Sequence, residues 1–255
     1  MPQLVFWIYA AVIGAAIGSF LNVCIARLPE GESVVSPRSR CPECGHAIGW
    51  RDNVPVLSYL LLGGKCRGCS TRISLQYPLV ELATAAIWVA AVARHGFAWQ
   101  ALAMAVFFTL LLGIALTDAR CYTIPDEFSI GGLVLGLLLS LAPGGITPLQ
   151  SLGGAALGFA LLWTVGWLGE AAFKKPAMGG GDIKMMAMVG AFLGPVGALL
   201  TIFLGALVGT LVFAPISWRT GKLVPFGIFL ALGAGVTDAW GPMLIDWYRG
   251  YLLGG

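Results

Sequence analysis

Residues 98–117 of the 255-residue chain read AWQALAMAVFFTLLLGIALT and contain no charged side chain. An apolar stretch of about 20 residues is long enough to cross the hydrocarbon core of a bilayer as an α-helix. An acid, Asp118, follows directly at the end of this stretch. The stretch therefore predicts a membrane-spanning helix with a carboxylate at one boundary.

The composition of the whole chain agrees with a membrane protein. Hydrophobic residues make up 58% of the chain, charged residues make up 11%, and the mean hydropathy is +0.87. Soluble domains carry about 25% charged residues. No basic segment precedes the first apolar stretch, which argues against a cleaved signal peptide. We predict an all-α polytopic protein with about eight transmembrane helices, over residues 4–24, 75–93, 98–117, 128–141, 149–168, 183–193, 196–217 and 223–237.

The basic residues predict the orientation of these helices. Every Lys and Arg except Arg94 and Arg249 falls in alternate connections between the apolar stretches. The positive-inside rule then places the N-terminus outside the cell and the basic connections in the cytosol. The alternation requires that the short stretch 183–193 also crosses the membrane. A multi-pass membrane protein, in contact with lipid and not with nucleic acid, is expected; the family resemblance described below implies the bacterial inner membrane.

The one long connection, residues 25–74, contains two C-x-x-C pairs. Four thiolates suit a tetrahedral zinc ion, and the cytosol disfavours structural disulfides. Twenty-one residues separate the pairs, slightly more than in common zinc sites. The alternative is two unconnected thiol pairs or a redox pair. A closed four-thiolate site leaves no position for water, so we predict structural zinc at Cys41, Cys44, Cys66 and Cys69.

Three acids stand at predicted helix ends on the cytosolic side. Asp118 follows a helix C-terminus, where the helix dipole disfavours negative charge, so its position favours a functional role. Asp126 precedes a new apolar helix, which favours a helix N-cap over chemistry. Asp182 follows Gly179–Gly181 and fits either an N-cap or a reactive group.

Two of these acids can form a catalytic pair. Two carboxylates within hydrogen-bonding distance cannot both be ionised, so they share one proton. The ionised acid can activate water, and the protonated acid can polarise a peptide carbonyl. Because glycine permits close approach of backbone, the three glycines leave room for an extended peptide or another helix beside Asp182.

Several motifs then resemble one family, the bacterial prepilin leader peptidases, which are membrane aspartic peptidases with a GxGD motif. That motif is Gly179–Asp182 here, and the family's first acid opens the pattern Asp118 to Pro125-Asp126. The resemblance covers nearly the whole chain. It includes GSFLNVCIARLP (18–29), the paired cysteines, DNVPVLSYL (52–60), GKCRGC (64–69), YPLVEL (77–82) and PFGIFLALG (225–233).

The resemblance implies two activities. The catalytic dyad would be Asp118 and Asp182, supported by Gly179, Gly181 and Asp126, and would remove the leader of type IV prepilins and pseudopilins. A methyltransferase activity would then methylate the new N-terminal amine, with S-adenosylmethionine as donor. The family's cysteine-bearing loop accompanies this second activity. In the family's usual RYP sequence, Gln76 replaces the arginine here.

The candidate methyl-transfer residues lie in or beside that loop. Gly64 and Lys65 match family positions associated with methylation. Glu81 can recognise the new amine or pair with Arg72 or Arg27. Asn22 and Arg27 bind the donor or anchor the helix end. Without a glycine-rich fingerprint after a strand, a Rossmann-type methyltransferase is not indicated.

The sequence thus divides into a first transmembrane helix (1–24), a cytosolic zinc-binding loop (25–74) and a transmembrane peptidase core (75–255). One alternative is a peptidase alone, with a structural zinc loop. Another is a proton-coupled transporter with the two acids as a relay, although no internal repeat supports it. A third is a zinc-held assembly scaffold without catalysis.

Overall fold

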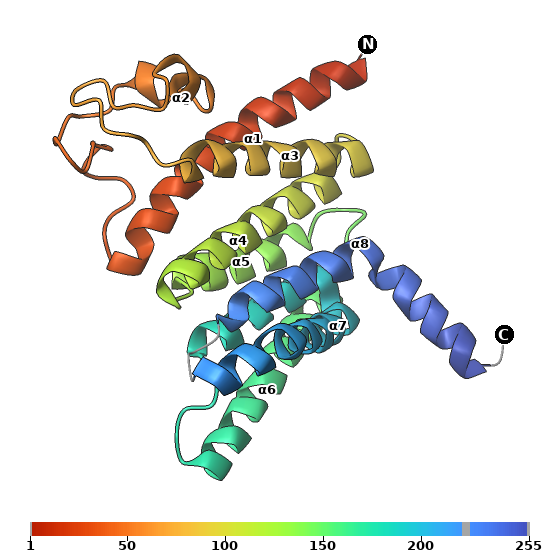
Figure 1. Ribbon diagram of the computed structural model, residues 1–255. Helices are drawn as coiled ribbons and strands as arrows, with labels where there is room; N and C mark the ends of the chain where they lie inside the picture. Colours follow the sequence, from red (N-terminus) through yellow and green to blue (C-terminus); the bar gives the residue numbers. More distant parts are fainter. Residues whose placement is uncertain (1, 221–224, 254–255) are drawn as a thin grey trace. The chain divides into compact units, whose positions relative to one another are not determined.

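The computed structural model describes residues 2–220 and 225–253, and for residues 2, 213–220, 252 and 253 it describes the backbone alone. Lys222 and the start of the predicted span 223–237 lie outside the described residues. The regular elements are helical, and the described residues contain only two isolated β-bridges (Figure 1). The long helices are α1 (Pro2–Arg27), α3 (Gln76–His95), α4 (Trp99–Cys121), α5 (Asp126–Leu139), α6 (Pro148–Phe173), α7 (Gly180–Thr220) and α8 (Phe226–Leu253). Three short helices, η1 (Leu28–Glu30), η2 (Trp50–Asn53) and α2 (Leu57–Leu61), lie between α1 and α3.

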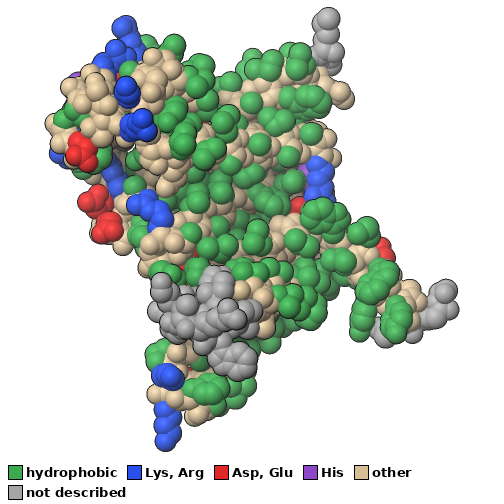
Figure 2. Space-filling view, in the orientation of Figure 1, with side chains coloured by type: hydrophobic (Ala, Val, Ile, Leu, Met, Phe, Trp, Pro, Cys, Tyr) green, Lys and Arg blue, Asp and Glu red, His purple; other side chains and the backbone are tan. Residues whose placement is uncertain are grey.

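The all-helical membrane fold predicted from the sequence is confirmed. Six helices of the described residues are long and apolar enough to cross a bilayer, namely α1, α3, α4, α6, α7 and α8. Hydrophobic side chains cover much of the face in Figure 2, and Lys and Arg gather over the connection between α1 and α3. Helix α5 has 14 residues, a length of about 21 Å, which is less than the hydrocarbon core. The number of crossings, predicted as about eight, stays a prediction.

The chain forms two compact units, residues 1–109 and 110–255, with the boundary inside α4. The sequence analysis divided the chain by expected function into 1–24, 25–74 and 75–255, whereas the two units are defined by contacts. The functional division stays a prediction.

In the first unit α1 packs closely against α3. A methyl group added at Gly14 would lie 2.8 Å from Cα of Ala85, and one at Gly18 would lie 2.7 Å from Cα of Glu81. Both glycines therefore allow the two backbones to approach, as small residues do between membrane helices.

In the second unit α7 is a helical hairpin. Gly194 interrupts the helix with φ 72° and ψ −177°, a conformation that glycine adopts readily. The limb before Gly194 packs on α6, where an added methyl at Gly154 would meet the carbonyl of Gly190. The limb after Gly194 packs on α8, where Gly205 adjoins Leu230. The spacings Gly154-x-x-x-Gly158 and Gly205-x-x-x-Gly209 thus provide small-residue packing surfaces on α6 and on the second limb of α7.

The contacts of neighbouring helices show that the second limb of α7 runs antiparallel to the first limb, back toward Gly180. Helix α5 lies parallel to the first limb, since Asp126 pairs with Lys184 and Gly136 adjoins Ala191. Helix α8 lies antiparallel to the second limb: Phe229 adjoins Gly209, and the Thr237 and Thr201 hydroxyls are 3.2 Å apart. The separately predicted stretches 183–193 and 196–217 are these two limbs.

Candidate active site and metal centre

The four cysteines of the first unit form one cluster. Their sulfur atoms all lie within 4.8 Å of one another, with 3.8 Å between Cys41 and Cys69 and 3.9 Å between Cys44 and Cys66. In a zinc tetrahedron with Zn–S bonds of about 2.3 Å, neighbouring sulfurs are about 3.8 Å apart. The cluster therefore fits structural zinc, as predicted, and it joins two segments that are far apart in the sequence.

The two C-x-x-C segments adopt the same turn. In the first, the Cys41 amide donates to the His46 carbonyl at 2.9 Å, and the Gly45 amide donates to the Cys41 carbonyl at 2.9 Å. In the second, Cys66 donates to Thr71 at 2.8 Å, and Ser70 donates to Cys66 at 2.9 Å. The equivalent positions Gly45 and Ser70 both have positive φ, 70° and 60°. Serine here occupies a conformation that favours glycine.

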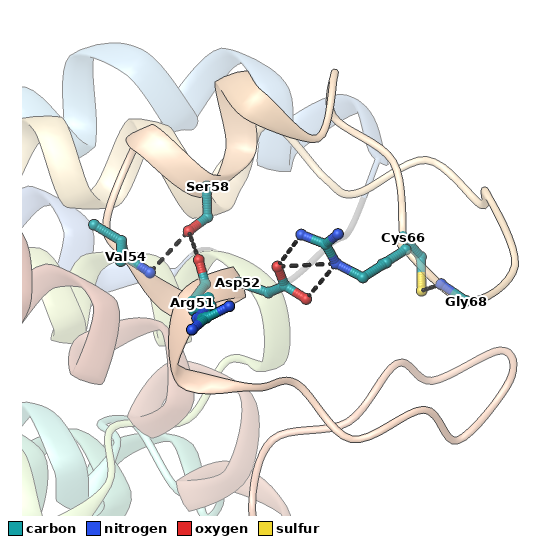
Figure 3. A network of polar contacts seen from close by, with 7 residues as sticks. Arg51, Asp52, Val54, Ser58, Cys66 and Gly68 are labelled. Carbon is teal, nitrogen blue, oxygen red and sulfur yellow. Dashed lines mark hydrogen bonds and ion pairs between the residues drawn. The ribbon is translucent and has the colours of Figure 1, made fainter.

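A polar network connects the second cysteine turn to the segment that follows the first (Figure 3). The Arg67 guanidinium binds the Asp52 carboxylate through two nitrogens, with Nη2 at 2.6 Å from Oδ1 and Nε at 2.9 Å from Oδ2. This arginine holds the pKa of Asp52 below its usual range. The Ser58 hydroxyl donates to the Arg51 carbonyl and accepts from the Val54 amide, both at 2.9 Å. The network thus fixes η2 and α2 beside the zinc cluster.

A cavity of about 460 Å³ lies beside the second cysteine turn and brings together two of the candidate methyl-transfer residues. Gly64 has φ 67°, and a methyl group added there would lie 2.8 Å from the Tyr59 hydroxyl. The sequence analysis missed Tyr59 and weighed Arg72 only as a partner of Glu81. Neither carried a spacing signal for this cavity, and Arg72 reaches it because the Lys65–Arg72 bridge closes the turn. The lining consists of Tyr59, Gly63, Gly64, Lys65, Arg72, Ile73 and Leu75.

The other three candidate methyl-transfer residues lie at the junction of α1, α3 and the loop. Asn22 is buried; its amide nitrogen donates to the Tyr77 carbonyl at 3.0 Å, and its Oδ1 has no partner among the described residues. Buried Glu81 accepts from the Val56 amide at 2.7 Å, so its partner is a backbone group and not the arginine weighed as an alternative. Arg27 donates to the Ser33 carbonyl at 2.9 Å, which fits the anchoring alternative.

In the second unit, Asp118 lies buried in the last turn of α4, with 5% of its surface exposed. Its Oδ2 accepts a hydrogen bond from the Ile228 amide at 3.2 Å. Ile228 belongs to the first turn of α8, whose free amides and dipole attract negative charge. The N-terminus of α8 therefore offsets the unfavourable position of Asp118 at the end of α4.

Asp182 lies in the first turn of α7, which begins at Gly180, so it is inside the helix and does not cap it. A methyl group added at Gly181, next to Asp182, would lie 2.9 Å from Ile124, and one at Gly227 would lie 2.9 Å from both Ile124 and Oδ2 of Asp118. The end of α4 and the start of α7 therefore lie on either side of Ile124, and the pairing of the two acids stays a prediction.

The three glycines before Asp182 have different surroundings. A methyl group added at Gly179 would lie 2.9 Å from Oδ2 of Asp182, and one at Gly181 would lie 2.9 Å from Cβ of Ile124. At Gly180 no described atom lies within 4 Å of such a group. Two of the glycines therefore leave room for parts of the protein itself, and only Gly180 faces open space.

Ile124 is a site residue that the sequence analysis missed. Its side chain is 91% buried and also lies 2.9 Å from a methyl group added at Gly227, next to Asp118. It therefore separates the first turns of α7 and α8, which carry Asp182 and the amide bound to Asp118. An isoleucine between two polar motifs gives no chemical signal in the sequence.

The prediction that Asp126 caps a helix is wrong. Pro125 occupies the N-cap position of α5, and Asp126 is the first helical residue. Its carboxylate pairs with Lys184 of α7, at 2.7 and 2.9 Å from Nζ. Asp126 thus connects the starts of α5 and α7, and its partner Lys184 is two positions from Asp182 in the chain.

Comparison with known proteins gives matches to each unit. The family described as "Bacterial Peptidase A24 N-terminal domain" matches residues 12–95, and the "Type IV leader peptidase family" matches residues 105–214. The first range lies within the first compact unit, and the second begins five residues before the boundary and continues in the second unit.

Curated relatives match over both units. A "Prepilin leader peptidase/N-methyltransferase" of Pseudomonas aeruginosa is 36% identical over 96% of this chain and 94% of its own length. The protein of that name in Pseudomonas putida is 35% identical over 94% of this chain and 93% of its own length. One in Myxococcus xanthus is 38% identical over 89% of this chain, which covers 64% of that longer relative. No solved structure matches the chain. The chain belongs to the prepilin leader peptidase/N-methyltransferase family.

Proposed function

We propose that this chain is a bifunctional membrane enzyme that removes the leader peptide of prepilins or pseudopilins and then methylates the new N-terminal amine. The observation that supports the peptidase assignment is that Ile124 adjoins both the first turn of α7, which carries Asp182, and the first turn of α8, whose Ile228 amide binds Asp118. The zinc cluster and adjoining cavity of the other unit support the second activity.

In the proposed cleavage, the two carboxyl groups share one proton. The ionised one removes a proton from water as the water oxygen attacks the scissile carbonyl carbon. The protonated one donates a hydrogen bond to the carbonyl oxygen. The tetrahedral intermediate then breaks its C–N bond, and a proton passes from the dyad to the departing amine.

The proposed methyl transfer uses the cavity beside the second cysteine turn. S-adenosylmethionine supplies an electrophilic methyl group when bound. Lys65 and Arg72 offer positive charge to its carboxylate, and the Tyr59 ring offers an aromatic surface to its adenine. The volume, about 460 Å³, is in the range of small-molecule sites. Zinc is structural in this proposal, because it holds the turn that carries Lys65 and Arg72.

Buried Glu81 and the unpartnered Oδ1 of Asn22 are the proposed acceptors for the new amine. The proposed orientation has the N-terminus outside the cell and both the loop and the dyad on the cytosolic side of the inner membrane. The basic connections support it through the positive-inside rule.

Mass spectrometry of a prepilin incubated with the purified protein, with and without S-adenosylmethionine, tests both activities together. Leader loss in both reactions and an added methyl only with the donor is the expected result. Leader loss without methylation in either reaction would reduce the proposal to a peptidase. An intact prepilin in both reactions would contradict the peptidase assignment.

A further inference from the structure

Helix α2 (Leu57–Leu61) shows its apolar side to the outside and its polar side to the inside. Leu57, Leu60 and Leu61 are 58%, 67% and 86% exposed, whereas Ser58 is buried with both its hydrogen bonds made. Figure 3 shows the Ser58 hydroxyl directed toward Arg51 and Val54. A segment surrounded by water normally has the opposite arrangement, so this outward leucine face requires an apolar neighbour.

The start of α2 is fixed to a membrane-spanning helix at a definite depth. The Val56 amide donates to Glu81 at 2.7 Å, and Glu81 is the sixth residue of α3. At 1.5 Å per residue, this contact lies about 7.5 Å inside the start of the span. Leu79, at a similar depth on α3, is 60% exposed, and an exposed leucine at this depth of a membrane-spanning helix is expected to contact lipid. The leucine face of α2 therefore lies close to the depth at which α3 enters the membrane.

Positive charge lies next to this face. Lys65 and Arg72 are both exposed, form an isolated β-bridge, and line the same cavity as Leu75. Leu75 directly precedes α3 and is 64% exposed. Basic residues at this level of a membrane protein attract anionic lipid headgroups.

We propose that α2 is an interfacial membrane anchor of the zinc-binding loop. Its three leucines lie in the outer acyl region of the leaflet, and the nearby positive charge of Lys65 and Arg72 favours anionic headgroups around it. Interfacial helices bury their apolar face about 5–10 Å into the boundary of headgroups and acyl chains, which agrees with the depth of the Val56–Glu81 contact. Lipid is favoured over a protein partner because the leucine face continues the lipid-facing surface of α3.

The experiment uses the full-length, zinc-loaded protein in nanodiscs that contain a phospholipid with a diazirine in its acyl chain. After irradiation, peptide mass spectrometry measures the labelling of each segment. We expect Leu57–Leu61 and Leu75 to be labelled about as strongly as Leu79.

Val35 is the internal control, because it is 85% exposed and belongs to the same loop. Asn22 of α1 binds Tyr77, so it lies level with the start of α3. Arg27 is five residues further along α1, about 7.5 Å beyond that level. Arg27 binds Ser33, and Val35 follows two residues later. Val35 therefore lies outside the membrane and should carry several-fold less label. Labelling of Leu57–Leu61 as weak as that of Val35 would overturn the anchor, because a leucine face covered by another protein chain would be shielded from the acyl-chain diazirine.

Two variants test the parts of the proposal separately. Leu60→Ser with Leu61→Ser should remove the labelling of 57–61 and leave that of Leu79 unchanged. In the parent protein, the diazirine lipid should label this region more strongly when its headgroup is phosphatidylglycerol than when it is phosphatidylcholine. Arg72→Gln should lower this ratio of labelling by about fivefold. An unchanged preference would overturn the attraction of anionic headgroups, and unchanged labelling in the serine variant would overturn the anchor. Neither readout depends on peptidase or methyltransferase activity.

Discussion

The backbone amide of Ile228 donates a hydrogen bond to the buried carboxylate of Asp118, although 110 positions separate the two residues in the chain. The end of α4 and the start of α8 thereby meet at one oxygen atom. The negative end of one helix dipole is compensated by the positive end of another. Any substrate that reaches Asp118 therefore meets a carboxylate that is already oriented.

The first prediction concerns the two acids. Asp118→Asn and Asp182→Asn should each lower leader cleavage by at least about 100-fold, because an amide cannot exchange the proton that the pair shares. Gel analysis of prepilin processing by purified variants measures the effect. Glu127→Gln, an exposed acid in the first turn of α5, is the matched control and should cleave normally. Normal cleavage by either Asn variant would remove that residue from the dyad.

The glycines before Asp182 should differ in their tolerance of alanine. Gly179→Ala pushes on the Asp182 carboxylate and Gly181→Ala pushes on Ile124, so each should lower kcat, and a displacement of about 1 Å can cost about 100-fold. Gly180→Ala meets no described atom within 4 Å and should stay within a few-fold of the parent enzyme. Steady-state cleavage kinetics of the three variants would compare them directly. The same loss in all three would contradict the separate roles assigned here.

Gly63 and Gly64 form a second matched pair, because both have positive φ, 60° and 67°. An alanine strains the backbone at either position, but only at Gly64 does its methyl group also meet the Tyr59 hydroxyl. Gly64→Ala should therefore lose more methyl transfer than Gly63→Ala, while both still cleave. Methylation of a mature pilin peptide gives the measurement, and equal losses would show that backbone strain alone is responsible.

The cysteine turns allow a stability test. Ser70→Gly should stabilise the zinc-bound loop by about 0.5–1 kcal/mol. Glycine adopts the positive φ of this position without the steric strain that serine has there, and this gain exceeds the extra backbone entropy that glycine loses on folding. Gly45→Ser places a serine at the equivalent position of the other turn and should destabilise it. Rates of zinc release to a chelator would order the proteins. Faster release from Ser70→Gly than from the parent would refute the strain argument.

Removal of a zinc ligand should separate the two activities. Cys41→Ser should lower the zinc content and methyl transfer, because the turn that carries Lys65 and Arg72 loses its support. Leader cleavage should persist, since the acids belong to the other compact unit. Elemental analysis and mass spectrometry of the products measure the two effects. A full zinc content in this variant would contradict the four-thiolate site.

The sequence predicted the features that residue type and spacing determine. Uncharged stretches such as 98–117 became helices, and two C-x-x-C pairs became one cluster, since apolar length and thiol spacing are local properties. The contact of Ile228 with Asp118 could not be predicted, because it uses a backbone amide that every sequence offers. Ile124 was missed for a related reason: its importance comes only from the two turns that it touches. Asp126 was read from its neighbours as a cap, whereas a lysine 58 positions away decides its role.

Helix α5 and the first limb of α7 lie parallel and begin with the residues Asp126 and Gly180. Each has about 14 residues and measures about 21 Å, whereas the hydrocarbon core of a bilayer measures about 30 Å. Such hydrophobic mismatch is relieved by local thinning of the lipid or by polar groups that lie below the headgroups. Either response brings water down to the acids at these helix starts, so the thickness of the surrounding membrane becomes part of the hydration of the site.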